Sequence, residues 1–368
     1  MISTIVWGCG GIARDAIRAV DAHPALELTA VLVTDPDRVG RDAGDLAELD
    51  RALGVVATDD SAVVFADRPR AVVYAGSGRT RSVDARADVL AALRAGAVVV
   101  TPPVHPLRDH HDPRSEFAAA VAEGGGSLFV GDVDPGWANH VLPLLLRGHG
   151  AGATSIRYRE IVDYSEYDLP RSVRALMGMG EPLSYRAPMF APRMPTTVWG
   201  DRLRLLARVL GVDVDEIRET VERLELEVSV ETATMGKFES GGQGAVRFEV
   251  QGYVAGEPRV VIEHIGRIDP DCAPDWPTVS AGGAAHQVVV EGDPWVETTI
   301  ESGPRDGTAA AVGRLVGAIE VLAGRPPGVY DAWALRDCES FWSPGGPEGL
   351  TGVEPPPERV PVRYRPKA

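Results

Sequence analysis

Residues 2–13 read Ile-Ser-Thr-Ile-Val-Trp-Gly-Cys-Gly-Gly-Ile-Ala, and this stretch decides the fold. The apolar run at 2–7 is typical of a buried parallel strand. The next six residues match the pattern G-x-G-x-x-A, and apolar residues at helical spacing follow them. In such a strand–turn–helix unit the glycines allow a tight turn and let the backbone approach a pyrophosphate, which the helix N-terminus attracts. The stretch therefore predicts a dinucleotide-binding unit.

Strand and helix signals continue to alternate up to residue 138. This alternation predicts an α/β fold with a doubly wound parallel sheet, whose ligands lie at the carboxyl ends of the strands. We expect strands at 2–7, 26–33, 54–58, 70–74, 97–100 and 127–130, and helices at 80–95 and 113–123.

Residues 139–305 have a different character and predict an α+β substrate domain with an open, mainly antiparallel sheet. The small residues of 306–323 favour close helix packing, so we expect 306–335 to rejoin the first domain. Residues 343–368 form a tail rich in proline and glycine. In the second domain we expect helices at 137–147 and 198–210, a strand at 224–231, and strand pairs at 245–255 with 259–269 and 286–291 with 295–302.

The charge of the chain restricts its partners. Lys and Arg number 37 against 53 Asp and Glu, a net charge of −16, and the basic residues form no stripe. We therefore expect neither a nucleic acid nor a membrane as partner, but a small-molecule substrate. The three cysteines Cys9, Cys272 and Cys338 have no metal-site spacing, so we expect no metal. The odd number of cysteines favours a reducing compartment, and the sequence shows neither a leader pattern nor a long apolar run. We therefore expect the protein in the cytoplasm.

Cofactor contacts are expected in the turns that follow the strands. Asp35 ends the second strand, where a carboxylate accepts from the ribose 2′-hydroxyl of NAD. Arg38 and Arg41 follow, and either could hold the 2′-phosphate of NADP. The choice between NAD and NADP thus stays open. The expected cofactor-binding residues are Gly8, Cys9, Gly10, Gly11, Ile12, Thr34, Asp35, Arg38, Arg41, Ala75, Gly76, Ser77, Thr101 and Pro102.

With these turns placed, the chain resembles the NAD(P)-dependent native amine dehydrogenases and 2,4-diaminopentanoate dehydrogenases, which are related to dihydrodipicolinate reductase. The segments Pro135-Gly-Trp137 and Ala273-Pro-Asp-Trp-Pro277 carry the resemblance most specifically. The resemblance implies a Rossmann domain, an α+β substrate domain, a homodimer, and hydride transfer at a C=N bond or the reverse reaction. The other matching segments are 8–13, 37–45, 99–101, 127–134, 142–145 and 160–165.

One departure from the family concerns its catalytic glutamate, which follows the fifth strand, binds ammonia and shuttles protons. Here residues 101–107 read Thr-Pro-Pro-Val-His-Pro-Leu, and His105 falls where the glutamate would be. Imidazole can act as a general acid or base near neutral pH, but it has no negative charge to recruit ammonium. Imine reduction or amine oxidation is our leading hypothesis. Ketone reduction and nucleotide binding without turnover are the alternatives.

Further candidates follow the sixth strand and begin the second domain. Asp132 and Asp134 could orient substrate or replace the missing acid, although aspartate is also a good helix cap. Tyr167 could donate a proton or wall the pocket. We therefore name His105, Asp134 and Tyr167 as catalytic candidates. The expected substrate pocket comprises Asp132, Trp137, Asp163, Met177 and Met179, of which the tryptophan and the methionines could instead be core.

Overall fold

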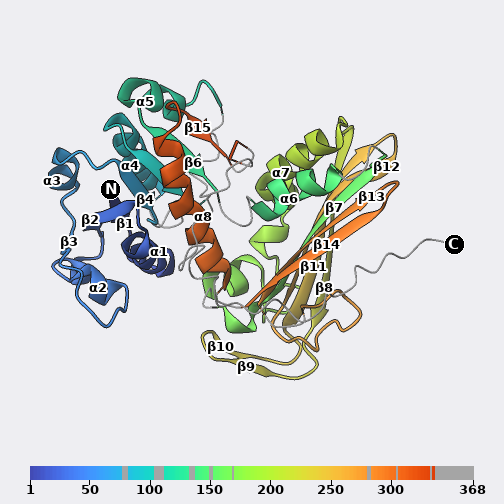
Figure 1. The fold of residues 1–368 in the computed structure, drawn as a ribbon. Helices are drawn as coiled ribbons and strands as arrows, with labels where there is room; N and C mark the ends of the chain where they lie inside the picture. The colour runs from blue at the N-terminus through green and yellow to red at the C-terminus, as the bar shows by residue number, and fades with distance from the viewer. Residues whose placement is uncertain are drawn as a thin grey trace, which may run out of the picture.

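The computed structural model describes residues 1–76, 82–102, 112–131, 137–148, 152–167, 170–279, 283–303, 306–331 and 334–335. These residues form two large sheets, one in each half of the molecule (Figure 1). Several sequence-based expectations lie outside the described residues, namely those on Ser77, His105, Asp132, Asp134, the Trp137 side chain and the tail at 343–368.

The first sheet has seven strands in the order β15-β6-β5-β4-β1-β2-β3, and all its pairings are parallel. The chain winds outward from β1 on one side and from β4 on the other, so the expected doubly wound sheet is confirmed. The neighbours β1 and β4 form the switch point at which ligands bind in such sheets. The strands are β1 Ile2–Trp7, β2 Leu26–Leu32, β3 Ala57–Thr58, β4 Ala71–Tyr74, β5 Val98–Thr101, β6 Ser127–Val130 and β15 Val329–Tyr330.

Helices cover both faces of this sheet. Helix α8 (Asp306–Ala323) packs against α1 (Gly11–Ala22), which confirms that the small-residue helix returns to the first sheet. Its Leu315 and Ile319 are fully buried. The opposite face is covered by α4 (Ser82–Arg94) and α5 (Glu116–Gly124). The expectation that α5 begins at Pro113 is wrong, because the Ser115 side chain caps the helix by accepting from the Ala118 N–H. The remaining short helices are η1 Pro36–Arg38, α2 Ala43–Leu46 and α3 Ser61–Ala66.

The second sheet is open, with the strand order β14-β13-β7-β12-β11-β8. Only β7 and β12 pair in parallel, so the mainly antiparallel sheet is confirmed, as are the two expected strand pairs. The expected strand at 224–231 is wrong. Pairing of β8 with β11 ends at Glu225, and the chain turns before β9. The strands are β7 Ser155–Asp163, β8 Glu216–Glu225, β9 Val230–Thr232, β10 Gly236–Phe238, β11 Gln243–Val254, β12 Glu257–Arg267, β13 Ala284–Glu291 and β14 Val296–Ser302.

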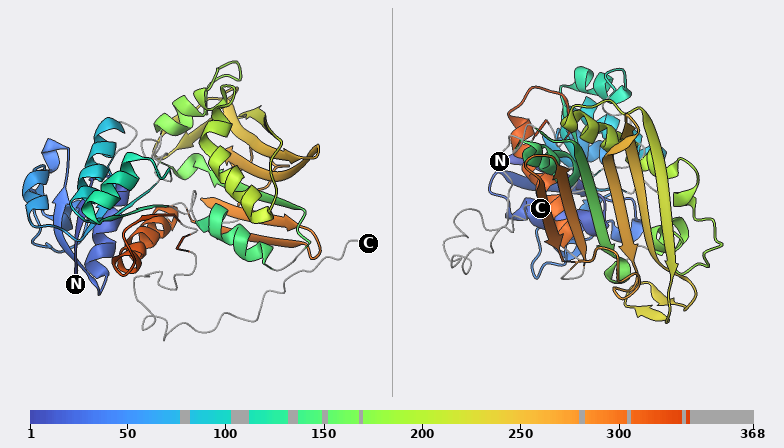
Figure 2. Two further views of the ribbon diagram at one scale, coloured as in Figure 1. Left: turned by 90° about the horizontal axis from the view of Figure 1, so that it is seen from above. Right: turned by 90° about the vertical axis from the view of Figure 1, so that its right-hand side faces the viewer.

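The two faces of the second sheet differ. One face packs on α6 (Leu142–Arg147), α7 (Met194–Leu210) and the π-helical turn η3 (Trp137–Val141), with Tyr158 and Leu203 in the core. In Figure 1 these helices lie on the side turned toward the first sheet. The opposite face, called here the outer face, lies toward the viewer in the right panel of Figure 2. It carries Arg157, Arg159 and Arg247 around the buried carboxylate of Glu263.

Among the described residues, no helix is long and apolar enough to cross a membrane.

Candidate functional site

The glycine-rich turn connects β1 to α1 at the switch point of the first sheet. Gly8 has φ +143°, and a Cβ there would lie 2.6 Å from the Ala75 carbonyl oxygen, so only glycine fits. Gly10 differs, because no atom lies within 4 Å of the place its Cβ would occupy. Gly10 is also the N-cap residue of α1 and has no side chain to satisfy the first N–H groups of the helix. The turn therefore leaves open space at a helix N-terminus, which suits a pyrophosphate.

The remaining residues of the turn agree with this arrangement. Ala13 is fully buried, so α1 lies close to the sheet. The first turn of α1 contains no acidic residue that would repel an anion. Cys9 is a partly exposed free thiol. Gly76 follows β4 beside Gly8, and a Cβ there would lie 2.6 Å from the Tyr74 hydroxyl oxygen. The backbone of Ala75 and Gly76 thus packs directly against Gly8.

The segment after β2 brings the expected ribose-binding residues together. Asp35 caps η1 by accepting from the Asp37 N–H at 3.1 Å. Its other oxygen lies 3.8 Å from the Arg38 guanidinium nitrogen, and both side chains are about two-fifths exposed. Arg41 is exposed and lies next to β3. Asp35 and Arg38 thus lie together just after β2, and the binding of a cofactor by these residues and Arg41 stays a prediction.

Thr101 ends β5 at the same edge of the sheet. It is fully buried, its hydroxyl donates to the Pro102 carbonyl, and its own carbonyl accepts from the Gly131 N–H at 3.1 Å. This main-chain hydrogen bond joins the carboxyl ends of the neighbouring strands β5 and β6. Residues 103–111 and 132–136 follow these two ends in the sequence.

The helix-covered face of the second sheet holds a chain of three polar side chains. The Glu160 carboxylate lies 2.8 Å from His264 Nδ1, and His264 Nε2 lies 3.0 Å from the Tyr164 hydroxyl. Burial alone would raise the pKa of Glu160. The hydrogen bond from His264, together with the charges of His264, His286 and Arg202, outweighs it and lowers that pKa to about 2. Glu160 is thus an anion held among polar and charged side chains, and its own side chain is about one-fifth exposed.

Tyr167 lies beside this chain. Its ring packs edge to face on Tyr164, with ring centroids 5.5 Å apart. Burial, together with the carboxylates of Glu160 and Asp163, raises the pKa of Tyr167 to about 12. The phenol therefore keeps its proton at neutral pH. This suits a hydrogen-bond donor, while a catalytic role for Tyr167 stays a prediction.

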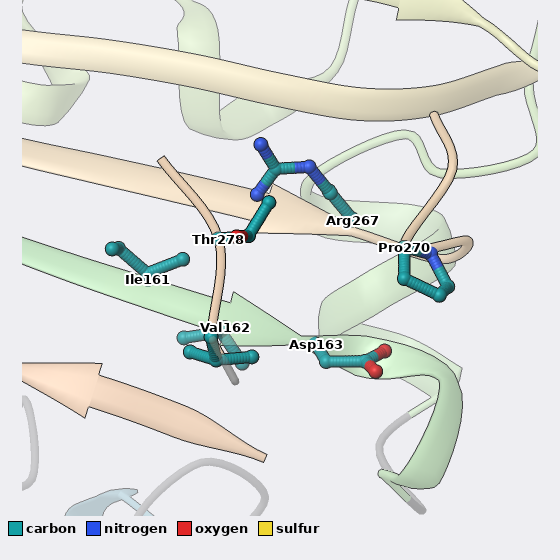
Figure 3. A pocket seen from close by; sticks show the side chains of 7 residues that line it. Ile161, Val162, Asp163, Arg267, Pro270 and Thr278 are labelled. Atoms are coloured by element: carbon teal, nitrogen blue, oxygen red, sulfur yellow. The ribbon is translucent and has the colours of Figure 1, made fainter. Parts of the chain in front are cut away.

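A cavity of about 300 Å³ lies at the carboxyl ends of β7 and β12. Figure 3 shows Asp163, Arg267 and Thr278 around it. The Arg267 guanidinium is buried and donates to the carbonyls of Cys272, Ala273 and Pro277, so it shapes the segment that the family resemblance singled out. Asp163 lines this cavity, and its contact with a substrate stays a prediction.

Met177 and Met179 are buried in the core of the second domain, 6% and 0% exposed. Their packing accounts for their apolar character, and a contact with substrate stays a prediction. Within the described part of the chain, no group of three His, Cys, Asp or Glu side chains could hold a metal ion.

Sequence reasoning missed His264, Arg267 and Arg202. The signal for His264 was present, since Glu263-His264 interrupts the apolar run at 260–265. The partners of His264 come from other strands and could not be found by spacing along one segment.

The comparisons with known proteins identify the family. An amine dehydrogenase from Streptomyces virginiae is 58% identical over 343 residues, which span 90% of this chain and 95% of the relative. The chain belongs to the amine dehydrogenase family. It is an enzyme of the oxidoreductase class, as the resemblance implied. No family model matches the chain.

Solved structures share the fold. An amine dehydrogenase from Mycobacterium smegmatis has a TM-score of 0.70 at 18% identity, covering 93% of this chain and 98% of that one. A dihydrodipicolinate reductase from Paenisporosarcina sp. TG-14 has a TM-score of 0.50 at 12% identity, covering 92% and 100%. GenD2 from gentamicin A biosynthesis, in complex with NAD, also has a TM-score of 0.50, at 19% identity and covering 88% and 87%.

Proposed function

We propose that this enzyme reduces a C=N bond of a small molecule with NAD(P)H, or oxidises the corresponding amine. The observation that carries the proposal is the open space at Gly10, before the N-terminus of α1. The family membership, and the NAD complex of a protein with the same fold, support it. When bound, the nicotinamide dinucleotide supplies or accepts hydride.

The protein's part is to hold the dinucleotide at the carboxyl edge of the first sheet. Backbone N–H groups at the start of α1 would bind the pyrophosphate. Asp35 would bind the ribose hydroxyls, and Arg38 or Arg41 a 2′-phosphate. The buried end of β5 at Thr101 would back the nicotinamide.

We further propose that His105 replaces the proton-shuttling glutamate of the family, because it follows the fifth strand in a segment, residues 101–107, that contains no acidic residue. An imidazole in that place cannot attract ammonium as a carboxylate does. The favoured substrate is therefore a preformed imine rather than a ketone with free ammonia.

Consumption of NADH and NADPH tests the proposal directly. The panel is a small cyclic imine (2-methyl-1-pyrroline), cyclohexanone, and cyclohexanone with ammonium chloride. We expect turnover with the imine, little with the other two, and loss of turnover in Gly10→Asp. Turnover of the ketone alone would favour a carbonyl reductase. Tight nucleotide binding without turnover of any substrate would favour a nucleotide-binding regulator.

We also propose a cytoplasmic homodimer. The outer face of the second sheet supports the dimer, because its central carboxylate, Glu263, is fully buried and paired with three arginines although none of the described helices covers that face (Figure 2). The molar mass in solution, measured by light scattering, should be twice that of one chain.

A further inference from the structure

The cavity at the carboxyl ends of β7 and β12 holds polar groups that the proposed function does not use. Its volume of about 300 Å³ is at the lower end of the range of ligand pockets, about 300–1,000 Å³. Three of the side chains that line it are polar, and they come from three segments (Figure 3). These are Asp163 of β7, Arg267 of β12 and Thr278 of the segment that follows β12.

We propose that this cavity is a binding site for a small zwitterionic amino acid, separate from the place of hydride transfer. The Asp163 carboxylate would bind the ammonium group of the ligand. The Arg267 guanidinium and the Thr278 hydroxyl would bind its carboxylate, and the apolar wall of the cavity would contact a short aliphatic side chain. The proposal goes beyond the proposed function and does not rest on it.

The strand register places the two charged side chains on the outer face of the second sheet. Tyr158 of β7 and Ile262 of β12 are neighbours in the sheet and belong to the helix-covered core. Asp163 and Arg267 lie five positions further along the same two strands and are neighbours as well. Because successive side chains of a strand point to opposite faces, both point to the outer face. The helix-covered face is the one turned toward the nucleotide-binding sheet (Figure 1).

Asp163 has a carboxylate oxygen available for a ligand. Its Oδ1 accepts from the Ser165 N–H at 2.9 Å and so caps η4 (Tyr164–Glu166). Among the residues that the structure describes, the other oxygen has no hydrogen-bond donor. An ionised carboxylate only accepts hydrogen bonds. The available oxygen therefore suits a cationic donor such as an ammonium group.

Arg267 brings the opposite charge to the same cavity. Its guanidinium has five N–H donors, of which three bind the carbonyls of Cys272, Ala273 and Pro277. These bonds hold the side chain in place and leave two N–H donors. Burial lowers the pKa of Arg267, and the carboxylate of Asp163 opposes that shift. The guanidinium keeps its proton at neutral pH, so the cavity contains a fixed cation.

The two charges are close but not paired with each other. Asp163 and Arg267, both described by the structure, interact through their charges without an ion pair within 4 Å. A zwitterion would pair with both and add no net charge to the cavity. A simple amine would be repelled by the guanidinium, and a simple carboxylate by Asp163. The charges therefore favour an amino acid over either of its two halves.

The wall of the cavity is apolar. Ile161 packs with Ile265 and Trp276 in a small cluster on the outer face, and Val279 packs against this cluster. Ile161 and Val279 also line the cavity, next to Thr278. Among the described residues, the Thr278 hydroxyl has no hydrogen-bond partner, and Thr278 is exposed. The ligand would thus place its polar groups beside Asp163, Arg267 and Thr278 and its aliphatic chain against this wall.

Two matched variants separate the charge of Asp163 from its structural role. Asp163→Asn removes the charge, while the asparagine Oδ1 can still accept from the Ser165 N–H and keep the turn. Asp269→Asn is the control. Asp269 follows β12, its Oδ1 accepts from the Asp271 N–H at 3.0 Å in a turn of the same kind, and it is not among the described residues that line the cavity.

Calorimetric titration of the full chain with L-norvaline, n-butylamine and valerate tests the proposal. The amine is norvaline without its carboxylate, and valerate is norvaline without its amino group. We expect norvaline to bind at least tenfold more tightly than either, since each half lacks one charge-assisted contact. Asp163→Asn should weaken norvaline binding at least tenfold, and Asp269→Asn should leave it unchanged. The affinity should be the same with and without saturating NADH, because the cavity lies on the outer face.

Three results would overturn the proposal. Norvaline could fail to bind or bind no more tightly than n-butylamine, or the wild type and Asp163→Asn could bind it equally. Norvaline binding that requires NADH would place the ligand at the reaction site and refute a separate site. None of these results affects the proposed function, which the turnover of 2-methyl-1-pyrroline tests.

Discussion

Gly10→Asp separates cofactor binding from folding. Gly10 has φ −84° and ψ −172°, an extended conformation that any residue adopts, and its missing Cβ faces open space. Aspartate is among the best N-cap residues and exceeds glycine by a few tenths of a kcal/mol, about 0.3. The free energy of unfolding of the variant should therefore equal or slightly exceed that of the wild type. Its carboxylate, however, would occupy the pyrophosphate site and repel it.

The expected loss of NADH or NADPH affinity is at least tenfold, or about 1.4 kcal/mol. Calorimetric titration measures the affinity, and thermal unfolding without nucleotide measures stability. Gly8→Ala is the comparison variant, because its methyl group would lie 2.6 Å from the Ala75 oxygen at a φ of +143°. It should lose about 1–3 kcal/mol of stability. A folded Gly10→Asp protein that binds both nucleotides like the wild type would refute the assignment of the turn.

Three further predictions concern single side chains. If Arg38 holds a 2′-phosphate, Arg38→Ala should weaken NADPH binding at least tenfold, by about 1.4 kcal/mol, and should change NADH binding little. If Arg38→Ala and Arg41→Ala instead change the binding of both nucleotides equally and only slightly, Asp35 is the decisive residue and the enzyme prefers NAD. His105→Glu should gain turnover of cyclohexanone with ammonium, because a carboxylate attracts ammonium, and robust ammonia-dependent turnover by the wild type would contradict the reasoning. Glu160 titrates near 4.5 when unfolded and about 2 when folded, so it stabilises the fold above pH 4.5, by roughly 3 kcal/mol, and loses that contribution as the pH falls toward 2. The unfolding free energy of Glu160→Gln should accordingly fall less steeply over this range than that of the wild type, as urea titrations at each pH would show.

The first domain could be predicted well because its signals are local. An apolar run, a glycine turn and a helical period lie within residues 2–20. The strands β4, β5 and β6 are buried along their whole length, so each is a continuous apolar run in the sequence. Strand β15 could not be expected, since two residues carry no period, and it forms only by pairing with β6. The strand expected at 224–231 failed because alternation continues through the turn that joins β8 to β9.

The site was predictable only in part, for a related reason. Asp35 and Arg38 are three residues apart, so their proximity follows from the sequence. Glu160 and His264 are 104 residues apart and meet because β7 pairs in parallel with β12, with these two residues in register. That register follows from the order of the strands in the sheet, which no local pattern specifies.

Transfer of deuterium from the cofactor tests the central claim most directly. The enzyme would be incubated with 2-methyl-1-pyrroline and with NADH and NADPH deuterated at C4 on either face, and the product analysed by mass spectrometry. Our account predicts a cyclic amine with one deuterium on the carbon bonded to nitrogen, from one face of the nicotinamide only. Deuterated cyclohexanol formed from cyclohexanone, with no labelled amine from the imine, would contradict it.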